Sequence, residues 1–134
     1  MKTTELMIGD KVMVKVLSQI PGTYVPHTWT ANDYSRDIQV KPIPLTSEIL
    51  EKNGFYRRNT QLHCKRFWSN GCFIIAIALC YREIEVSKVC DAGTDCEELE
   101  YDSTVAFGND ICVHTLQHAL RLCELDELAD NFKV

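Results

Sequence analysis

The sequence predicts an α+β protein with a small SH3-like β-barrel at the N-terminus, a linker helix, and an antiparallel β-meander packed on a long C-terminal helix. Three patterns favour it: apolar residues alternate near the start of the chain, an Asn-Gly turn separates two apolar runs, and an amphipathic stretch lies near the end. The 134 residues suit one core with a small satellite. We place the barrel at residues 1–44 and the α+β domain at residues 45–134.

The N-terminal part shows the pattern of short strands. Val12, Val14 and Val16 alternate with other residues after a turn at Gly9-Asp10, which is typical of a half-buried strand. Two more short β-type segments follow, and Pro, Gly and Asn-Asp turn residues separate them. These segments, Tyr24-Val25 and Ile38 to Val40, predict a compact barrel of SH3-like form.

The segment from Pro42 to Leu45 should be extended, because a proline disfavours helical conformation in the residue before it. Thr46 then suits the N-cap of a short helix over 47–53, and Gly54 suits its left-handed stop. The segment therefore marks a boundary between the two parts of the chain.

The middle of the chain predicts a β-meander. Ser69-Asn70-Gly71 lies between two strand-like runs, 62–68 and 72–81, and Asn-Gly in that place is a strong hairpin signal. Residues 73–79 lack polar alternation, so we expect a central strand covered on both faces. Residues 83–89 are expected to form an edge strand.

The last third predicts an acidic surface segment, a final strand and a long helix. Residues 91–102 contain six acidic residues and no basic one, which favours a loop or frayed helix. A strand over 104–107 should follow, and Gly108 or Asn109 should cap a helix that runs to about Leu128.

Composition narrows the classes of function. Residues 1–88 carry a net charge of +4 and residues 89–134 one of −9, so the chain as a whole is acidic at −5. This balance disfavours non-specific duplex binding, which depends on phosphate neutralisation by Lys and Arg. The longest uncharged stretch, 72–81, is about half of the ~20 residues that a membrane helix needs. Without a signal-peptide pattern, we expect a cytoplasmic protein.

The seven cysteines are expected to be predominantly reduced, since an odd number without a secretion signal is typical of a reducing compartment. We interpret most of them as small core residues. No C-x2-C pair and no phosphate-binding glycine loop is present, so we expect no cofactor and no metal site.

Three stretches of the chain together resemble a known set of proteins: Met7 to Val12, Pro42 to Phe55, and Val113 to Cys123. The chain is similar to small uncharacterised proteins of Bacteroidales genomes, their phages and mobile elements. The resemblance implies the layout given above and a phage or mobile-element setting, but no activity. Thr115 stands where glutamate is frequent in that family, and Glu124 where glycine is frequent.

The amphipathic C-terminal stretch supplies the main candidate site. At 100° per residue its polar side chains gather on the face opposite the apolar stripe of Leu116 and Leu120. We therefore interpret this face as solvated, and as a candidate surface for a protein or small-molecule partner. Two of its residues have the i, i+4 spacing of a zinc-binding helix, but Thr115 replaces the glutamate of the metalloprotease motif. The candidate residues are His114, Gln117, His118 and Arg121.

A second candidate surface mixes basic and aromatic residues, as sites for single-stranded nucleic acid do. Its basic residues are Arg57, Arg58, Lys65 and Arg66, and aromatic residues stand beside them. Three hypotheses of function thus remain open. The first is a non-enzymatic binding protein whose partner is a host protein or a small metabolite; the alternatives are a nucleic-acid-associated accessory protein and a metal-dependent hydrolase.

Overall fold

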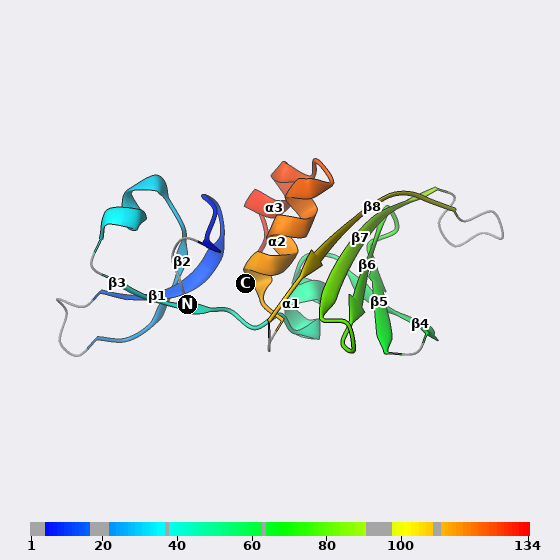
Figure 1. The fold of residues 1–134 in the computed structure, drawn as a ribbon, viewed down its shortest axis with the longest axis horizontal. Helices are drawn as coiled ribbons and strands as arrows, with labels where there is room; N and C mark the ends of the chain where they lie inside the picture. Colours follow the sequence, from blue (N-terminus) through cyan, green and yellow to red (C-terminus); the bar gives the residue numbers. More distant parts are fainter. Residues whose placement is uncertain (1–4, 17–21, 37, 63, 91–97, 109–110) are drawn as a thin grey trace.

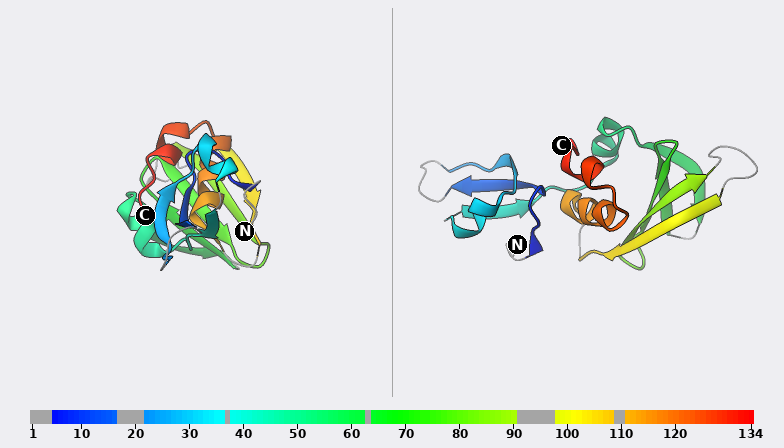
Figure 2. Two further views of the ribbon diagram at one scale, coloured as in Figure 1. Left: turned by 90° about the vertical axis from the view of Figure 1, so that its left-hand side faces the viewer. Right: turned by 90° about the horizontal axis from the view of Figure 1, so that it is seen from above.

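The computed structural model describes residues 5–16, 22–36, 38–62, 64–90, 98–108 and 111–134. It shows an α+β protein in which eight described strands form two antiparallel sheets. A three-stranded sheet lies at one end of the molecule and a five-stranded sheet at the other, with the helices α2 and α3 between them (Figure 1). Figure 2 shows the same sequence of layers from above.

The small sheet consists of β1 (Lys11–Val16), β2 (Val25–Thr28) and β3 (Ile38–Pro42), in the order β2-β1-β3. The predicted alternation in β1 is confirmed for Val12 and Val14, which are buried in a hydrophobic cluster that contains Leu6, Trp29 and Val40. Within the described residues β2 and β3 both pair with β1 and not with each other, so the sheet does not close into the barrel expected there.

The linker and the first helix, α1 (Ser47–Lys52), agree with the prediction. The Thr46 side chain accepts a hydrogen bond from the Ile49 N–H (3.3 Å), and Gly54 has a φ of +84° after the helix. The extended linker also pairs with the segment that leads into α2. The Leu45 N–H donates to the Ile111 carbonyl (3.0 Å) and the Val113 N–H donates to the Ile43 carbonyl (2.8 Å).

The large sheet contains β4 (Tyr56–Leu62), β5 (Lys65–Ser69), β6 (Phe73–Ala78), β7 (Glu83–Cys90) and β8 (Glu98–Ala106), in sequence order. The Asn-Gly hairpin prediction is confirmed: Asn70 Oδ1 accepts hydrogen bonds from the N–H groups of Cys72 and Phe73, and Gly71 has a φ of +92°. As expected, β6 is the central strand, and its residues 74–78 are buried on both faces.

Two predictions for this sheet are wrong. β7 is not an edge strand, because β8 pairs with it along most of its length. For the same reason Glu98 to Asp102 are part of a strand and not of a loop or frayed helix: pairing with β7 satisfies their backbone, which a count of acidic residues does not reveal. The remainder of that expected segment, residues 91–97, lies outside the described residues.

The C-terminal helix is shorter than predicted. α2 (Val113–Leu122) begins after Cys112, and α3 (Asp126–Asp130) follows as a separate short helix. Glu124 has a φ of +61°, a left-handed conformation that ends the helical ladder. The predicted caps do not start the helix: Gly108 follows β8, and Asn109 lies outside the described residues. The apolar stripe of α2, including Leu116 and Leu120, belongs to the main hydrophobic cluster of the large sheet.

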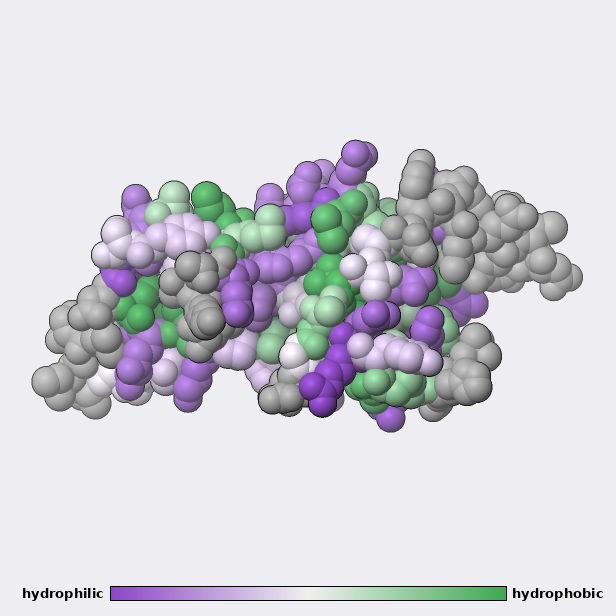
Figure 3. Space-filling model, in the orientation of Figure 1, coloured by the Kyte–Doolittle hydropathy of each residue, from purple (hydrophilic) through white to green (hydrophobic). Residues whose placement is uncertain are grey.

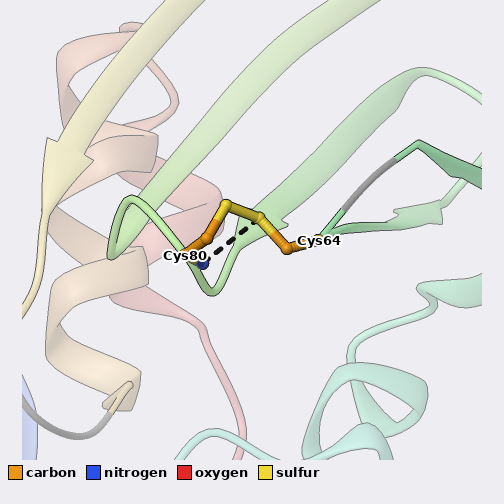
Figure 4. The surroundings of a disulfide bond; sticks show 2 residues. All are labelled: Cys64 and Cys80. Atoms are coloured by element: carbon orange, nitrogen blue, oxygen red, sulfur yellow. Dashed lines mark hydrogen bonds between the residues drawn. A yellow bond between two sulfur atoms is a disulfide. The ribbon is translucent and has the colours of Figure 1, made fainter.

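Cys64 and Cys80 form a disulfide (Figure 4), so this pair is an exception to the expectation that the cysteines are predominantly reduced. The register of the β5-β6 hairpin explains why the two cysteines are close. Lys65 pairs with Ala78, so Cys64 and Cys80 follow at the same end of the hairpin, with their Cα atoms 5.9 Å apart. Their separation of 16 residues in the sequence contains no sign of it. The core interpretation holds for the buried Cys112 but not for Cys72, which is exposed.

The surface is mixed in character. Figure 3 shows hydrophilic side chains over the turn between α2 and α3, and apolar ones in the centre of the same view. In the part of the chain that the structure describes, no helix is long and apolar enough to cross a membrane.

Candidate functional site

The polar face of α2 lies against the turn that precedes β1, and this seam joins the two halves of the molecule. Asp10 is at its centre and is fully buried. Its Oδ1 accepts a hydrogen bond from Arg121 Nη1 (2.6 Å), and its Oδ2 interacts with His118 Nε2 (2.7 Å). The Met7 N–H also donates to Oδ2 (2.8 Å). One carboxylate thus holds two side chains of α2 that are more than 100 residues away in the sequence.

Gln117 supplies the second link across the seam. Its side chain is fully buried, and its Oε1 accepts a hydrogen bond from the Lys11 N–H (2.8 Å). Its Nε2 donates to the carbonyls of Gly9 (3.0 Å) and Ala129 (2.8 Å). A single amide therefore satisfies backbone groups of the β1 turn and of α3, which would otherwise be buried without partners.

Gly9 makes the close approach of the turn to α2 feasible. It has a φ of +95°, and a Cβ at this position would lie 2.7 Å from Asp130 Oδ1 and 2.9 Å from Arg121 Nη2. Both the backbone conformation and the available space therefore require glycine here.

A cavity of about 340 Å³ opens beside this cluster. His114, Thr115 and His118 of α2 form one wall, and the end of β8 forms another. The rings of the two histidines meet edge to face, with centroids 5.7 Å apart. Among the described residues the lining contains one carboxylate, no lysine or arginine and several apolar side chains; its other members are Glu5, Pro42, Val105, Ala106, Phe107, Gly108 and Cys112.

His114 is the unusual member of this wall. It is only 9% exposed, and its Nδ1 is buried without a hydrogen-bond partner among the described residues. Burial lowers the pKa of His114 below its ordinary value, and this effect outweighs the opposing charge of Asp10. The ring is therefore neutral at pH 7, with a polar atom left unsatisfied.

Asp10 shows the opposite balance. Burial alone would raise its pKa, but the hydrogen bonds from His118, Arg121 and the Met7 N–H outweigh burial, and the pKa lies below its ordinary value. The carboxylate is therefore ionised at neutral pH. The His118 ring bonds to Asp10, and among the described residues no serine or threonine hydroxyl bonds to this ring as in a Ser-His-Asp triad.

The structure corrects the prediction that the polar face of α2 is solvated. The helical periodicity correctly grouped the four side chains, but the β1 turn covers them. His114 and Gln117 are buried, and the side chains of His118 and Arg121 are 21% and 10% exposed. Gln117 and Arg121 are committed to contacts within the chain. His114 and His118 also line the cavity and remain candidate ligand-binding residues.

A related cluster lies inside the N-terminal part. Asp33 is 2% exposed and belongs to the 3-10 helix Ala31–Ser35. It accepts hydrogen bonds from the Thr30 N–H (2.8 Å) and Arg36 Nη1 (2.9 Å), and its Oδ2 lies 2.7 Å from His27 Nε2. Burial alone would raise the pKa of Asp33, but these bonds outweigh it and hold the pKa well below its ordinary value.

The predicted basic-aromatic surface is not assembled on one face. Arg57 pairs with Trp68 in the sheet and lies over its ring, with the guanidinium 5.0 Å from the ring centroid. Arg66 and Lys65 are neighbours on β5, so their side chains point to opposite faces. Lys65 Nζ lies 3.8 Å from Glu85 Oε2. A nucleic-acid strand could not contact all four predicted cations at once.

The described residues contain no group of three His, Cys, Asp or Glu side chains that could hold a metal ion. Sequence reasoning missed Asp10, Gly9 and the cavity. The sequence did indicate a turn at Gly9-Asp10, but nothing in it showed that this turn contacts α2. No family model matches the chain, and neither a curated protein nor a solved structure is significantly similar to it.

Proposed function

We propose that this chain is a non-enzymatic binding protein that holds a small polar metabolite in the cavity beside the Asp10 cluster. The observation that carries the proposal is His114, a neutral buried histidine whose Nδ1 has no partner among the described residues. A buried polar atom without a hydrogen bond costs about 1–3 kcal/mol, so a ligand that supplies the bond is stabilised.

The lining indicates the kind of ligand. Glu5 offers a hydrogen-bond acceptor, Thr115 and the neutral His114 each offer a donor and an acceptor, and Val105, Phe107 and Pro42 offer apolar surface. This combination suits a molecule with one donor group, such as an amine, amide or hydroxyl, on a short apolar body. A volume of about 340 Å³ is within the range of small-ligand sites.

The family resemblance adds the setting. In our proposal the protein is one of the small binding proteins of phages or mobile elements in Bacteroidales. In the same proposal the described N-terminal part bounds the cavity on one side through Glu5 and Pro42, and α2 with the end of β8 bounds it on the other.

The test is a screen of small alkyl amines, amides and alcohols by NMR, with the imidazole signals of His114 and His118 as the readout. We expect a hit to shift both rings in the native protein. His114→Phe, which fills part of the cavity, should abolish the shift, and Leu122→Ala should retain it because Leu122 is 65% exposed on the same helix. If no compound moves these signals, or if the shifts persist in His114→Phe, the proposal is wrong.

A further inference from the structure

One face of the small sheet carries basic side chains on both sides of Met13, which itself packs against the main hydrophobic cluster. Successive residues of a strand point to opposite faces, so the side opposite the buried Val12, Val14 and Val40 carries its own set of side chains. Among the described residues that set includes three lysines and no carboxylate. Its members are Lys11, Met13, Lys15, Tyr24, Pro26, Thr28, Gln39 and Lys41.

Two of these lysines gather on one aromatic ring. Lys15 Nζ lies 5.3 Å and Lys41 Nζ 4.2 Å from the centroid of the Tyr24 ring. The Tyr24 hydroxyl donates to Gln39 Oε1 (3.2 Å), which helps to fix the ring between them. Within the described residues neither ammonium has a carboxylate within 4 Å. Since the two charges repel each other, an anion bound to either ammonium would relieve the repulsion and be stabilised.

The positive charge continues from Tyr24 toward a groove. Lys11 is four residues from Lys15 on the same strand, about 13 Å at ~3.3 Å per residue. It lines a groove of about 350 Å³, together with Lys133 and His27. Two aspartates of the N-terminal part, Asp10 and Asp33, offset little of this charge, because both are buried and each is bound to an arginine and a histidine.

We infer that this face binds the phosphate backbone of single-stranded nucleic acid. Such sites combine a basic groove that follows the backbone with aromatic side chains, and the face offers both. The chain's net charge of −5 disfavours broad attraction to a duplex, so a local surface of this kind suits a strand that contacts few phosphates. The inference is independent of the small-molecule cavity, with which this face shares no lining residue.

Fluorescence anisotropy with labelled oligo(dT) and oligo(U), at salt concentrations between about 50 and 200 mM, tests the inference. For single strands the slope of log K against log[salt] is about −0.7 per phosphate contacted, so three lysines predict a slope of about −2. In the double variant Lys15→Ala/Lys41→Ala the slope should fall to about −0.7, with at least about tenfold weaker binding at low salt. Lys52→Ala, on the exposed side of α1, should bind like the native protein.

A charge-preserving variant, Lys15→Arg/Lys41→Arg, should retain binding, and the thermal midpoints of all variants should match that of the native protein. The inference is overturned if neither oligonucleotide binds at about 50 mM salt, or if Lys15→Ala/Lys41→Ala leaves the slope unchanged. It is equally overturned if Arg57→Ala/Arg66→Ala abolishes binding instead. Stronger binding of a poly-glutamate peptide than of either oligonucleotide would show that the face serves an acidic protein.

Discussion

Two buried aspartates organise this molecule, and they differ in the distance over which they act. Asp33 is bound by His27, Thr30 and Arg36, all within six residues of it. Asp10 is bound by His118 and Arg121, which are 108 and 111 residues away. The chemistry is the same, a carboxylate with a histidine and an arginine. The first cluster shapes one turn of the small sheet, and the second joins the two halves of the protein.

The comparison predicts a difference in stability. In Asp10→Ala, Arg121 and His118 would remain mostly buried without their partner, and breaking a buried ion pair costs about 3–5 kcal/mol. In Asp33→Ala, the side chains of His27 and Arg36 are 28% and 45% exposed, so water can replace the carboxylate and we expect about 1–3 kcal/mol. Urea denaturation of the two variants measures both values.

Asp130→Ala is the control for this pair. Asp130 is exposed and its contact with Arg121 is long, at 3.5 Å, so its removal should change the free energy of unfolding by less than about 0.5 kcal/mol. A larger loss in Asp33→Ala than in Asp10→Ala would mean that the seam between the halves is weaker than its contacts indicate.

The two clusters also show what can be predicted from the sequence. The Asp33 cluster is local: Thr30 and Asp33 have a spacing at which side chain and backbone commonly bond in helix starts, and His27 and Arg36 stand three residues further out on each side. No sequence signal of this kind marks the Asp10 cluster. Asp10 comes close to His118 and Arg121 only because the small sheet docks on α2. For the same reason the hairpin at Asn70-Gly71 and the helix cap at Thr46 were predictable, whereas the disulfide and the place of β8 were not.

The polar face of α2 carries the same lesson. Helical periodicity states which residues share a face, but it does not state what covers that face. His114, Gln117, His118 and Arg121 do share one side of α2, and the β1 turn buries it. Polar side chains are rarely buried unless they have hydrogen-bond partners, so the sequence analysis interpreted this polar face as solvated. The partners that allow its burial come from the opposite end of the chain.

Gln117 provides the second test of the long-range contact. Gln117→Ala would remove three hydrogen bonds at about 1 kcal/mol each and leave backbone groups of Gly9 and Lys11 without partners, so we expect a loss of about 2–4 kcal/mol. Leu120→Ala, on the apolar face, should cost about 2–5 kcal/mol. Leu122→Ala is the exposed control on this helix. If Gln117→Ala unfolds like Leu122→Ala in thermal or urea denaturation, the polar face does not hold the seam.

The smallest expected effect is on the pH dependence of the unfolding free energy. It comes from His114 in the wall of the cavity and not from the two aspartate clusters. Burial lowers the pKa of His114, whereas in the unfolded chain a histidine titrates at about 6.5. As pH falls below that value the unfolded state takes up the proton first, so the folded protein loses stability until the pH passes the folded pKa of His114. Above about pH 7 both states are neutral and the contribution vanishes. Asp10 and Glu5 face the ring and oppose this shift, while His118 adds to it.

Between about pH 7.5 and pH 5.5 the unfolding free energy should therefore decline more steeply for the native protein than for His114→Asn, whose amide does not titrate. An identical decline in the two proteins would show that the buried ring does not resist protonation, and the acceptor role that we assign to it in the cavity would then have no basis.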